Sequence, residues 1–439
     1  MSKTATSAEL EIIRESLGYA YRFRSKLFVI NIDYSVIEDQ FFPILLKDIA
    51  TLHQAGIRIV LVPGTREKVN RTLENYSIPC EYYQGLRITS EAALPFVEMV
   101  AFNVANVLMS GLAGSGVRST IGNWVRARGR GIIDGVDYQY TGVVESVDVS
   151  AINTILESSM VPIFPPIGWN TGGKTYNVSA EELALSISTG LSAEKLFYVC
   201  DTAVMDNSAL RVPKGIDFQA GERISRLTIQ EARELVKLNT EDGEMVRRIE
   251  LAMRACELGV NRVHIVDGMQ EGVILQEIFS NQGIGTMVHT NIFESIRPME
   301  RTDVSEVLHI MEPFISRGIL LPRDTQSLEE LYQDFFVYDI DGRVHGCAAL
   351  HTYPDSQGEI AAVAVDHRFS RMGIGKRLVL YVLEQAKERG FRRVFALTTQ
   401  TADWFEKLGF RQGGLEEISG KKRSSYDHSR NSRIYIYDL

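Results

Sequence analysis

A glycine-spaced segment in the last third of the chain could bind an anionic ligand. Residues 363–365 belong to an apolar run, Gly373 and Gly375 follow, and a helix-forming sequence continues to Leu378. Glycines let the backbone curl so that consecutive N–H groups point in one direction, and the N-terminus of the next helix adds partial positive charge. The pattern therefore predicts a strand, a turn able to hold a pyrophosphate, and a helix. Its spacing differs from that of a Rossmann turn and of a P-loop.

The elements that must position this turn follow a regular rhythm through the first two thirds of the chain. Short apolar runs alternate there with longer amphipathic ones, which predicts an α/β layer structure with a mainly parallel sheet. The predicted strands cover residues 27–32, 57–62, 161–164, 195–200 and 263–266. The predicted helices cover residues 41–55, 66–76, 180–191 and 244–258, and another helix is expected before them at residues 9–24.

The rhythm changes between residues 288 and 298, so a second domain is predicted to begin near residue 292. It would contain about 145 residues, enough for a core of its own. Thr302 or Asp303 could cap its first helix. Its strands are predicted at residues 334–338, 346–351, 359–365, 393–398 and 434–437, and its last helix at residues 401–408, before Gly409.

Composition restricts the class of protein. The chain has 439 residues, which predicts two or three domains, and its 47 basic and 56 acidic residues give a net charge of −9. This balance favours neither a nucleic-acid footprint nor binding to an anionic membrane. The four cysteines are far apart, which argues against a zinc site or a disulfide framework. The first residues lack an apolar signal segment, so we expect a cytoplasmic protein without a metal.

Two motifs of the second domain resemble the GNAT N-acetyltransferases. Ser370 to Gly375 follow the family's pattern Arg/Gln-x-x-Gly-x-Gly/Ala, except that Ser370 replaces the usual Arg or Gln, and residues 403–410 read Asp-Trp-Phe-Glu-Lys-Leu-Gly-Phe, like the family's late helix. The resemblance implies a smaller α+β domain that uses acetyl-coenzyme A. The residues that it assigns to the cofactor are Val363, Ala364, Val365, Arg371, Met372, Gly373, Ile374, Gly375 and Lys376.

Acetyl transfer to an amine requires a general base and a stabilised oxyanion, because only the neutral amine attacks the thioester. Glu359 begins the strand that leads to the turn, which favours it as the base acting through a water, although a solvated carboxylate at a strand end is equally compatible. The backbone at residues 363–365 would hold the oxyanion. Thr398 ends the next strand and could give a proton to the departing thiolate, or could simply form a turn.

Residues 26–291 resemble the amino-acid kinase fold, and acetylglutamate kinase in particular. The resemblance rests on residues 131–137, 176–182, 259–268 and 284–287. Where the kinases have Lys-x-Gly-Gly, this chain has Asn31-Ile-Asp33-Tyr34, and Glu181 and Arg248 replace the family's Asp and late catalytic Lys. Phosphoryl transfer depends on positioning and charge around the phosphates. We therefore predict a kinase-like domain without kinase activity.

A kinase-like domain fused to a GNAT domain resembles the N-acetylglutamate synthases over the whole chain. The resemblance implies acetylation of L-glutamate in arginine biosynthesis, with feedback control by L-arginine whose sign the sequence leaves open. Its glutamate ligands fall on Arg323, Arg430 and Ser432, and its arginine site on Tyr19, His264, Glu277 and Gly283. Residues 1–25 match a helix that borders the arginine site and pairs subunits into a homo-oligomer, a hexamer by resemblance.

Simpler roles remain for several of these residues. His264 could be a buried strand histidine and Glu277 an exposed helix residue, and Lys421, Lys422 and Arg423 are expected to be solvated. Three other functions are also considered: acetylation of a different amine, a non-catalytic arginine sensor, and a bifunctional synthase and kinase. Arg323 and Arg430 favour a dicarboxylate substrate, since arginine binds carboxylates in a fork-like geometry.

Overall fold

The computed structural model describes residues 21, 23–201, 210–213, 216, 218–219, 223–239, 243–279, 283–290, 294–340, 343–369 and 373–439. Contacts divide the chain into two compact units, Met1–Asn291 and Ile292–Leu439. Most of the helix expected at residues 9–24 lies outside the described residues, as do Tyr19, Ser370, Arg371 and Met372.

Unit 1 is built on an eight-stranded sheet with the order β16-β18-β17-β13-β1-β2-β10-β5. All neighbours are parallel except β17 and β18. Parallel strands buried on both faces read as nearly continuous apolar runs, as Leu27–Ile32 does. The strands are β1 (Leu27–Ile32), β2 (Arg58–Pro63), β5 (Ser119–Ile121), β10 (Val161–Ile163), β13 (Lys195–Cys200), β16 (Arg226–Thr228), β17 (Arg262–Asp267) and β18 (Thr286–His289).

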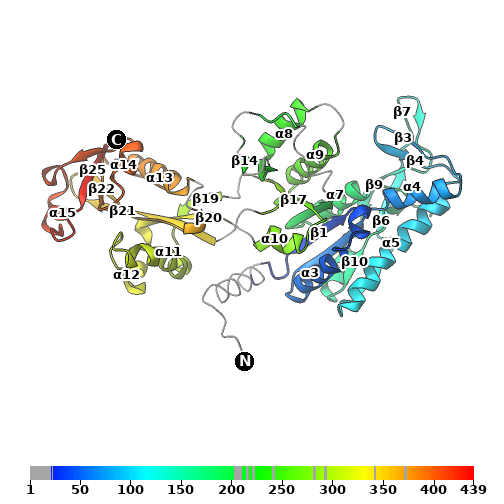
Figure 1. Cartoon of the computed structure of the whole chain (residues 1–439), viewed down its shortest axis with the longest axis horizontal. Helices are drawn as coiled ribbons and strands as arrows, with labels where there is room; N and C mark the ends of the chain where they lie inside the picture. The colour runs from blue at the N-terminus through cyan, green and yellow to red at the C-terminus, as the bar shows by residue number, and fades with distance from the viewer. Residues whose placement is uncertain are drawn as a thin grey trace. The chain divides into compact units, whose positions relative to one another are not determined.

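Helices cover both faces of this sheet and make a three-layer α/β unit (Figure 1). Alternate residues of β1 enter two separate cores, Phe28 with one and Val29 with the other. The first core contains α2 (Tyr34–Ile37), α3 (Phe42–Gln54), α4 (Arg66–Asn75), α5 (Leu94–Gly114) and α10 (Val273–Phe279). The second contains α6 (Val149–Glu157), α7 (Ala180–Gly190), α8 (Ile229–Leu238) and α9 (Glu244–Glu257).

Small sheets complete unit 1. A four-stranded one has the order β12-β11-β6-β9, and three two-stranded ones join consecutive strands. Their strands are β3 (Glu81–Tyr83), β4 (Leu86–Ile88), β6 (Val125–Gly129), β7 (Ile132–Ile133), β8 (Val136–Asp137), β9 (Gly142–Val147), β11 (Ile167–Trp169), β12 (Thr175–Asn177), β14 (Phe218–Gln219) and β15 (Arg223–Ile224).

The long helix α5 is apolar enough to cross a membrane by length and composition. Its buried residues, which include Val97, Val104 and Leu108, recur at helical spacing and pack in the first core of unit 1. One face of α5 therefore packs in the core of unit 1.

Unit 2 contains a seven-stranded sheet with the order β19-β20-β21-β22-β23-β25-β24. Every neighbouring pair is antiparallel except β22 and β23. The strands are β19 (Glu294–Pro298), β20 (Phe335–Ile340), β21 (Arg343–Tyr353), β22 (Gln357–Val365), β23 (Arg393–Thr398), β24 (Arg411–Gly413) and β25 (Arg433–Asp438). The parallel pair lies at the centre of the sheet, and its connection is long enough to include a helix.

The sheet of unit 2 has helices on both faces (Figure 1). Ile360 of β22 points to the face covered by α13, and Ala349 of β21 points to the face covered by α11. The helices are α11 (Val304–Ser316), α12 (Thr325–Leu331), α13 (Ile374–Glu388), α14 (Ala402–Lys407) and α15 (Gly420–Ser424), with short 3₁₀ turns at Arg301–Asp303, Tyr332–Asp334, His367–Phe369 and Leu415–Glu417.

These features confirm the predicted fold class, an α/β unit with a mainly parallel sheet followed by a smaller α+β unit. The strands predicted at residues 27–32, 195–200 and 393–398 have those bounds in the structure, and the other elements begin or end one to three residues away. One detail is wrong: Asp303 stands before α11, but its carboxylate makes no capping bond to that helix. It accepts instead from the N–H of Glu300 at 2.8 Å and from Arg297 at 2.7 Å, which satisfy it locally.

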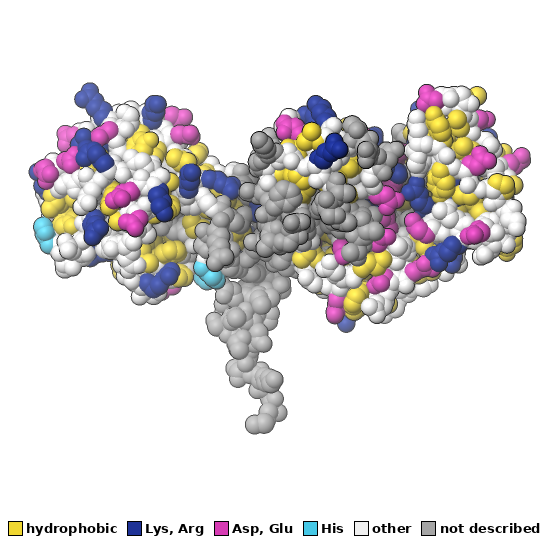
Figure 2. Space-filling model, turned by 45° about the horizontal axis from the view of Figure 1, so that its top comes forward, with side chains coloured by type: hydrophobic (Ala, Val, Ile, Leu, Met, Phe, Trp, Pro, Cys, Tyr) yellow, Lys and Arg dark blue, Asp and Glu magenta, His cyan; other side chains and the backbone are white. Residues whose placement is uncertain are grey.

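The surface carries both signs of charge. Where Figure 2 shows the described residues of each unit, basic and acidic side chains are interspersed with apolar ones, and neither sign dominates a whole face. This mixture agrees with the net charge of −9 and offers no extended basic surface on the side that is seen.

Candidate active site

A cavity of about 470 Å³ lies in unit 2, on the face of the sheet that α11 covers. Four of the predicted site residues line it, namely Glu359, Arg323, Arg430 and Ser432. They come from β22, from the segment after α11, and from the segment that leads into β25. The fold therefore gathers the predicted base and the predicted substrate ligands, which are far apart in the sequence, around one space.

Glu359 lies in the wall of this cavity with 4% of its surface exposed. Both carboxylate oxygens are held: Lys422 Nζ lies 2.7 Å from Oε1, and the Tyr353 hydroxyl donates to Oε2 at 2.8 Å. Burial and the neighbouring Glu359 raise the pKa of Tyr353, which keeps its proton available for this bond. Glu359 is therefore not the solvated strand-end carboxylate that the sequence also allowed.

The interpretation of Lys422 as a solvated side chain is wrong. Lys421 and Arg423 are exposed on the short helix α15, as expected, but Lys422 turns inward and its side chain is 19% exposed. The physical reason is Glu359, because a carboxylate in so buried a place needs a cation close to it.

Arg323 is fixed by a chain of polar contacts. Its Nη2 lies 3.1 Å from His351 Nε2, and His351 Nδ1 lies 2.7 Å from Asp334 Oδ2. With Nδ1 donating to Asp334, Nε2 carries the lone pair that accepts from Arg323. The guanidinium is thus oriented by neutral imidazole and retains its charge for a ligand.

The residues His351 and Tyr353 were not identified from the sequence, although a signal for them exists. They are two positions apart on β21, so they share one face of the strand, and His351 pairs directly with Glu359 of β22. Pro354 and Asp355 mark the turn between the two strands. Strand alternation across this hairpin would have placed both side chains beside Glu359.

Arg430 and Ser432 also line the cavity and come from the segment just before β25. Arg430 Nη2 donates to the carbonyls of Gly318 and Ile319, both at 3.0 Å, and so connects this segment to the one that carries Arg323. The backbone carbonyl of Ser432 accepts from the Tyr426 hydroxyl at 2.6 Å. The bonds of Arg430 hold the wall of the cavity in shape. Because their acceptors are neutral carbonyls, they do not compensate the positive charge of Arg430.

The strand β22 changes its pairing beside the cavity. It pairs with β23 from Gln357 to Ile360, although both strands continue beyond that point, and its register with β21 shifts near Ala349. Ala362 adopts φ +52°, a left-handed conformation that is uncommon for alanine. Such a conformation costs about 1 kcal/mol or more and is often found at functional sites. The backbone at residues 363–365, the predicted oxyanion holder, follows this irregularity.

The glycine turn has the predicted form where the structure describes it. Gly373 has φ +69° and is the N-cap of α13, and Ile374, Gly375 and Lys376 form the first turn of this helix. A Cβ on Gly375 would lie 3.4 Å from Trp404, so the small residue permits the close approach of α14. The N-terminus of a 15-residue helix with glycines around it suits the pyrophosphate of a coenzyme. Arg371 and Met372 lie outside the described residues.

Thr398 ends β23 but is not among the residues that line the cavity. Its hydroxyl accepts from the N–H groups of Gln400 at 3.3 Å and Thr401 at 3.0 Å, and it shares a bond with the Thr401 hydroxyl at 2.7 Å. These are the contacts of a turn-forming hydroxyl.

In unit 1, three of the predicted arginine-site residues form one cluster. His264 Nδ1 lies 2.7 Å from Glu277 Oε1, and Glu277 Oε2 accepts from the N–H groups of Ile284 at 2.6 Å and Gly285 at 2.8 Å. Gly283 has φ +63°, and a Cβ there would lie 2.7 Å from Glu277 Oε2. The simpler interpretation of His264 is compatible with its burial, but Glu277 is 7% exposed and so is no exposed helix residue.

Lys195 completes this cluster, with Nζ 3.5 Å from His264 Nε2. Burial and the charge of Lys195 lower the pKa of His264 to about 4. Burial would raise the pKa of Glu277, but the bonds from His264 and the two backbone N–H groups lower it overall. Glu277 is therefore charged at neutral pH, and the imidazole of His264 is neutral.

We expect the stability of unit 1 to depend on His264 between about pH 6.5 and pH 4. Because the folded pKa lies below the unfolded one, the stabilisation is complete above pH 6.5 and is lost as the pH falls to 4, by about 3 kcal/mol. His264→Gln cannot titrate, so urea unfolding of both proteins at several pH values should show the wild-type advantage shrinking with acid. The raised pKa values of Asp33 and Asp48 act in the opposite direction in both proteins. Parallel pH profiles would contradict the expectation.

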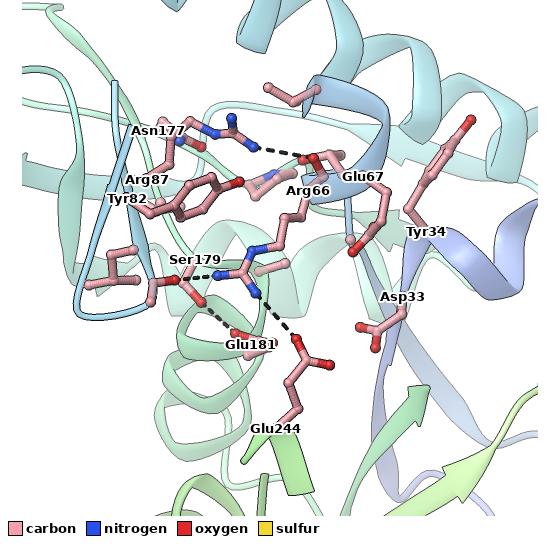
Figure 3. A pocket seen from close by; sticks show the side chains of 18 of the residues that line it. Asp33, Tyr34, Arg66, Glu67, Tyr82, Arg87, Asn177, Ser179, Glu181 and Glu244 are labelled. Carbon is pink, nitrogen blue, oxygen red and sulfur yellow. Dashed lines mark hydrogen bonds and ion pairs between the residues drawn. The ribbon is translucent and has the colours of Figure 1, made fainter. Parts of the chain in front are cut away.

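Unit 1 also contains a cavity of about 120 Å³ where three helices begin (Figure 3). Arg66 opens α4, Glu181 lies in the first turn of α7, and Glu244 opens α9. Figure 3 shows the Arg66 side chain crossing the cavity, with bonds to the carbonyl of Gly85 and to Glu244, 3.4 Å away. Convergent helix N-termini would suit phosphates, yet this arginine is already engaged with protein groups.

An ion-pair network lies in the wall of this cavity. Arg248 Nη2 lies 2.6 Å from Asp33 Oδ2 and 3.1 Å from Glu181 Oε1, and its Nη1 donates to Asn31 Oδ1 at 3.2 Å. Burial alone would lower the pKa of Arg248, but the two carboxylates raise it well above its usual value. Asp33, Glu181 and Arg248 are among the residues predicted from the sequence to replace the kinases' phosphate-binding groups.

Among the residues that the structure describes, no group of three or more His, Cys, Asp or Glu side chains could hold a metal ion.

Comparison with known proteins gives the same two parts. Residues 26–267 match the amino acid kinase family and residues 304–410 match the acetyltransferase (GNAT) family. An amino-acid acetyltransferase of Neisseria meningitidis serogroup B is 34% identical over 436 residues, which are 97% of each chain, and that of Escherichia coli is 30% identical over 453 residues and the full length of both.

Solved structures agree over the same length. N-acetylglutamate synthase from Neisseria gonorrhoeae complexed with coenzyme A and L-arginine has a TM-score of 0.85 at 32% identity, with 98% of this chain and 99% of that one covered. The same enzyme complexed with coenzyme A and N-acetyl-glutamate has a TM-score of 0.61 at 34% identity and the same coverage. Because it has both units, the cavity around Glu359 and full-length relatives above 30% identity, this chain is a member of the amino-acid acetyltransferase family.

Proposed function

We propose that this enzyme transfers acetyl from acetyl-coenzyme A to the amine of L-glutamate, giving N-acetyl-L-glutamate and coenzyme A. The observation that carries the proposal is the cavity of unit 2, where a buried carboxylate, Glu359, faces a space also lined by Arg323 and Arg430. A glutamate molecule has one ammonium and two carboxylates. The cavity offers a base for the former and guanidinium groups for the latter.

In this proposal Glu359, through a water, removes a proton from the substrate ammonium so that the neutral amine can attack the thioester carbonyl. Backbone N–H groups at residues 363–365 donate to the developing oxyanion, beside the point where β22 parts from β23. Acetyl-coenzyme A supplies the acyl group and is bound along the Gly373 turn. Thr398 would help the departing thiolate, since its own proton is free to move when Thr401 is the donor in their shared bond.

The substrate carboxylates are proposed to bind Arg323, Arg430 and the Ser432 side chain. The chain Asp334–His351–Arg323 fixes one guanidinium, and the carbonyls of Gly318 and Ile319 fix the other. Preorganised groups lose less freedom when a ligand binds, so the two arginines can select a dicarboxylate at low entropic cost.

L-Arginine is proposed to regulate the enzyme at the cluster of His264, Glu277 and Gly283, with Tyr19 as a further ligand. Glu277 is the natural partner of a guanidinium because the carboxylate is already ionised and fixed. This proposal is supported by the relative that binds L-arginine together with coenzyme A.

Replacing Glu277 by glutamine should weaken arginine control while sparing catalysis. The amide keeps the shape of the side chain but loses the charge that would pair with the effector, so we expect at least a tenfold rise in the arginine concentration needed for half-maximal effect. Titration of arginine against coenzyme A release measures it. Unchanged sensitivity would place the effector elsewhere in the protein.

The test of the main proposal is steady-state release of coenzyme A with and without L-glutamate, with a panel of other amino acids and with arginine titrated in. Glutamate-dependent release that arginine suppresses is the expected result. Release with another amine would move the substrate and keep the enzyme class. Arginine binding without release for any amine would favour a sensor.

We further propose that unit 1 lacks kinase activity and that the enzyme works in the cytoplasm as a homo-oligomer. The support for the first point is Arg248, whose guanidinium is occupied by Asp33 and Glu181. Phosphoryl transfer requires free cations around the phosphates. Acetylglutamate-dependent turnover of ATP would overturn this proposal.

A further inference from the structure

The catalytic carboxylate of the proposed reaction is already bound to a cation of the protein. Lys422 Nζ lies 2.7 Å from Glu359 Oε1, and the two side chains are 19% and 6% exposed. A base in this state must give up the ion pair before it can approach the ammonium of a substrate. The groups that compensate each charge must therefore change when the substrate binds.

The charges of the cavity indicate where Lys422 can go. Arg323 contacts the neutral Nε2 of His351, and Arg430 contacts two backbone carbonyls, so both can receive carboxylates without breaking an ion pair. Lys422 alone among these three cations is paired with the base. A ligand with a second carboxylate brings an anion that can take the place of Glu359 as the partner of this ammonium.

We infer that Lys422 is a positioning residue that strengthens the preference for a dicarboxylic amino acid beyond what Arg323 and Arg430 provide. In the free enzyme Lys422 neutralises Glu359. When the substrate binds, its second carboxylate attracts the Lys422 ammonium, and Glu359 is released to accept from the water that bridges it to the substrate ammonium. Glu359 and Lys422 each keep an oppositely charged partner through this exchange, which is what buried charges require. The inference rests on the proposed acetylation of glutamate.

A neutral amino acid such as glutamine cannot complete the exchange. Its amide oxygen can accept a hydrogen bond but carries no charge, so Lys422 either stays on Glu359 and blocks the base, or leaves and remains uncompensated. The penalty falls on the catalytic step as well as on binding. Lys422 would thus make the release of Glu359 as a base depend on the second carboxylate of the substrate.

The element that carries Lys422 is suited to such a movement. It is α15, Gly420–Ser424, a five-residue helix on which no residue is fully buried. A lysine side chain has a long flexible stem, so the ammonium can move without disturbing the core of unit 2. Tyr353 stays on the other oxygen of Glu359 and keeps the carboxylate in place during the exchange.

The experiment compares L-glutamate and L-glutamine as substrates of the full-length wild-type enzyme, Lys422→Met and Lys422→Arg, measuring kcat and KM for each. We expect Lys422→Met to lower the glutamate-to-glutamine ratio of kcat/KM at least tenfold, through a higher KM for glutamate and a higher kcat for glutamine. Lys422→Arg keeps the charge and should restore most of the ratio.

Two further variants separate this role from simpler ones. Lys407→Met removes the same charge from an exposed position of α14 that does not line the cavity, and should keep the ratio within about twofold, since distant exposed charges act weakly. Tyr353→Phe removes the other contact of Glu359 without removing a charge, and should lower kcat for both substrates by a similar factor. The pattern expected is therefore a change of preference at residue 422 alone.

Several outcomes would overturn the inference. An unchanged glutamate-to-glutamine ratio of kcat/KM in Lys422→Met would overturn it. If both values fall equally, Lys422 is a structural residue. If neither falls, Lys422 does not affect substrate choice. If Lys422→Met no longer binds coenzyme A, it is misfolded and Lys422→Gln takes its place. An unchanged glutamate-to-glutamine ratio of kcat/KM in folded Lys422→Gln would overturn the inference in the same way. Wild-type enzyme that uses glutamine as well as glutamate contradicts the role of Lys422 but keeps the acetyltransferase. No release with any amine removes the proposed function and this inference together.

Discussion

Glu359→Gln should lower kcat for glutamate acetylation by about 10²- to 10⁴-fold, the usual contribution of a general base. The amide has nearly the same shape and can still receive the Tyr353 hydroxyl, but it cannot accept a proton. KM for acetyl-coenzyme A should stay near that of the wild type, because Glu359 lies at the cavity and away from the described part of the coenzyme turn. Steady-state kinetics and coenzyme A binding measure both quantities.

Glu330→Gln is the matched control for this substitution. Glu330 is an exposed residue of α12 in the same unit, and its carboxylate accepts from Gln326 at 3.2 Å. The same chemical change there should alter kcat by less than twofold. A Glu359→Gln enzyme that keeps more than a tenth of the wild-type kcat would show that another group, or the solvent, removes the proton.

The fold could be predicted because its elements have local signals. The strand Leu27–Ile32 is a continuous run of apolar and β-branched residues apart from Asn31, and it is buried on both faces of the sheet. Glu359 could be found because it lies near the start of the strand that leads to a recognisable turn. In both cases the information lies within a few residues of the feature.

The remaining details depend on contacts that no local pattern contains. Ala362 lies in the run Ile-Ala-Ala-Val-Ala-Val, and nothing in these residue types predicts a left-handed φ of +52°. Lys422 stands in a basic, polar segment and is turned inward only because Glu359, 63 positions earlier, lies beside it. Tertiary context overrides local preference at both positions, and both are at the cavity.

The ion-pair network of unit 1 likewise could not be predicted from the sequence. The sequence predicts which residues replace the glycines and lysines for phosphates, but not that these residues pair with one another. Asp33 and Arg248 are 215 positions apart and meet at 2.6 Å, where the ends of β1 and the start of α9 adjoin. A buried charge is costly without an opposite charge beside it, so Asp33 and Arg248 each make the other tolerable at these positions.

Arg248→Met should destabilise unit 1 by about 3 kcal/mol or more, because it leaves the Asp33 carboxylate buried without its cation. Glu181 keeps Arg247 as a partner at 2.7 Å, which limits the loss. Trp404 is the one tryptophan of unit 2, so in a Trp404→Phe background the fluorescence of Trp124 and Trp169 reports urea unfolding of unit 1. Acetyl transfer below the unfolding transition should be retained.

The double variant Asp33→Asn with Arg248→Met distinguishes an ion pair from a packing role. Removing both charges takes away the unmatched carboxylate, so the double variant should be more stable than Arg248→Met alone. Arg247→Met, whose guanidinium is 33% exposed, should cost less than Arg248→Met. If the double variant is as unstable as the sum of the single ones, Arg248 stabilises unit 1 by filling space. In that case the pairing of Arg248 with Asp33 and Glu181 is incidental to the stability of unit 1.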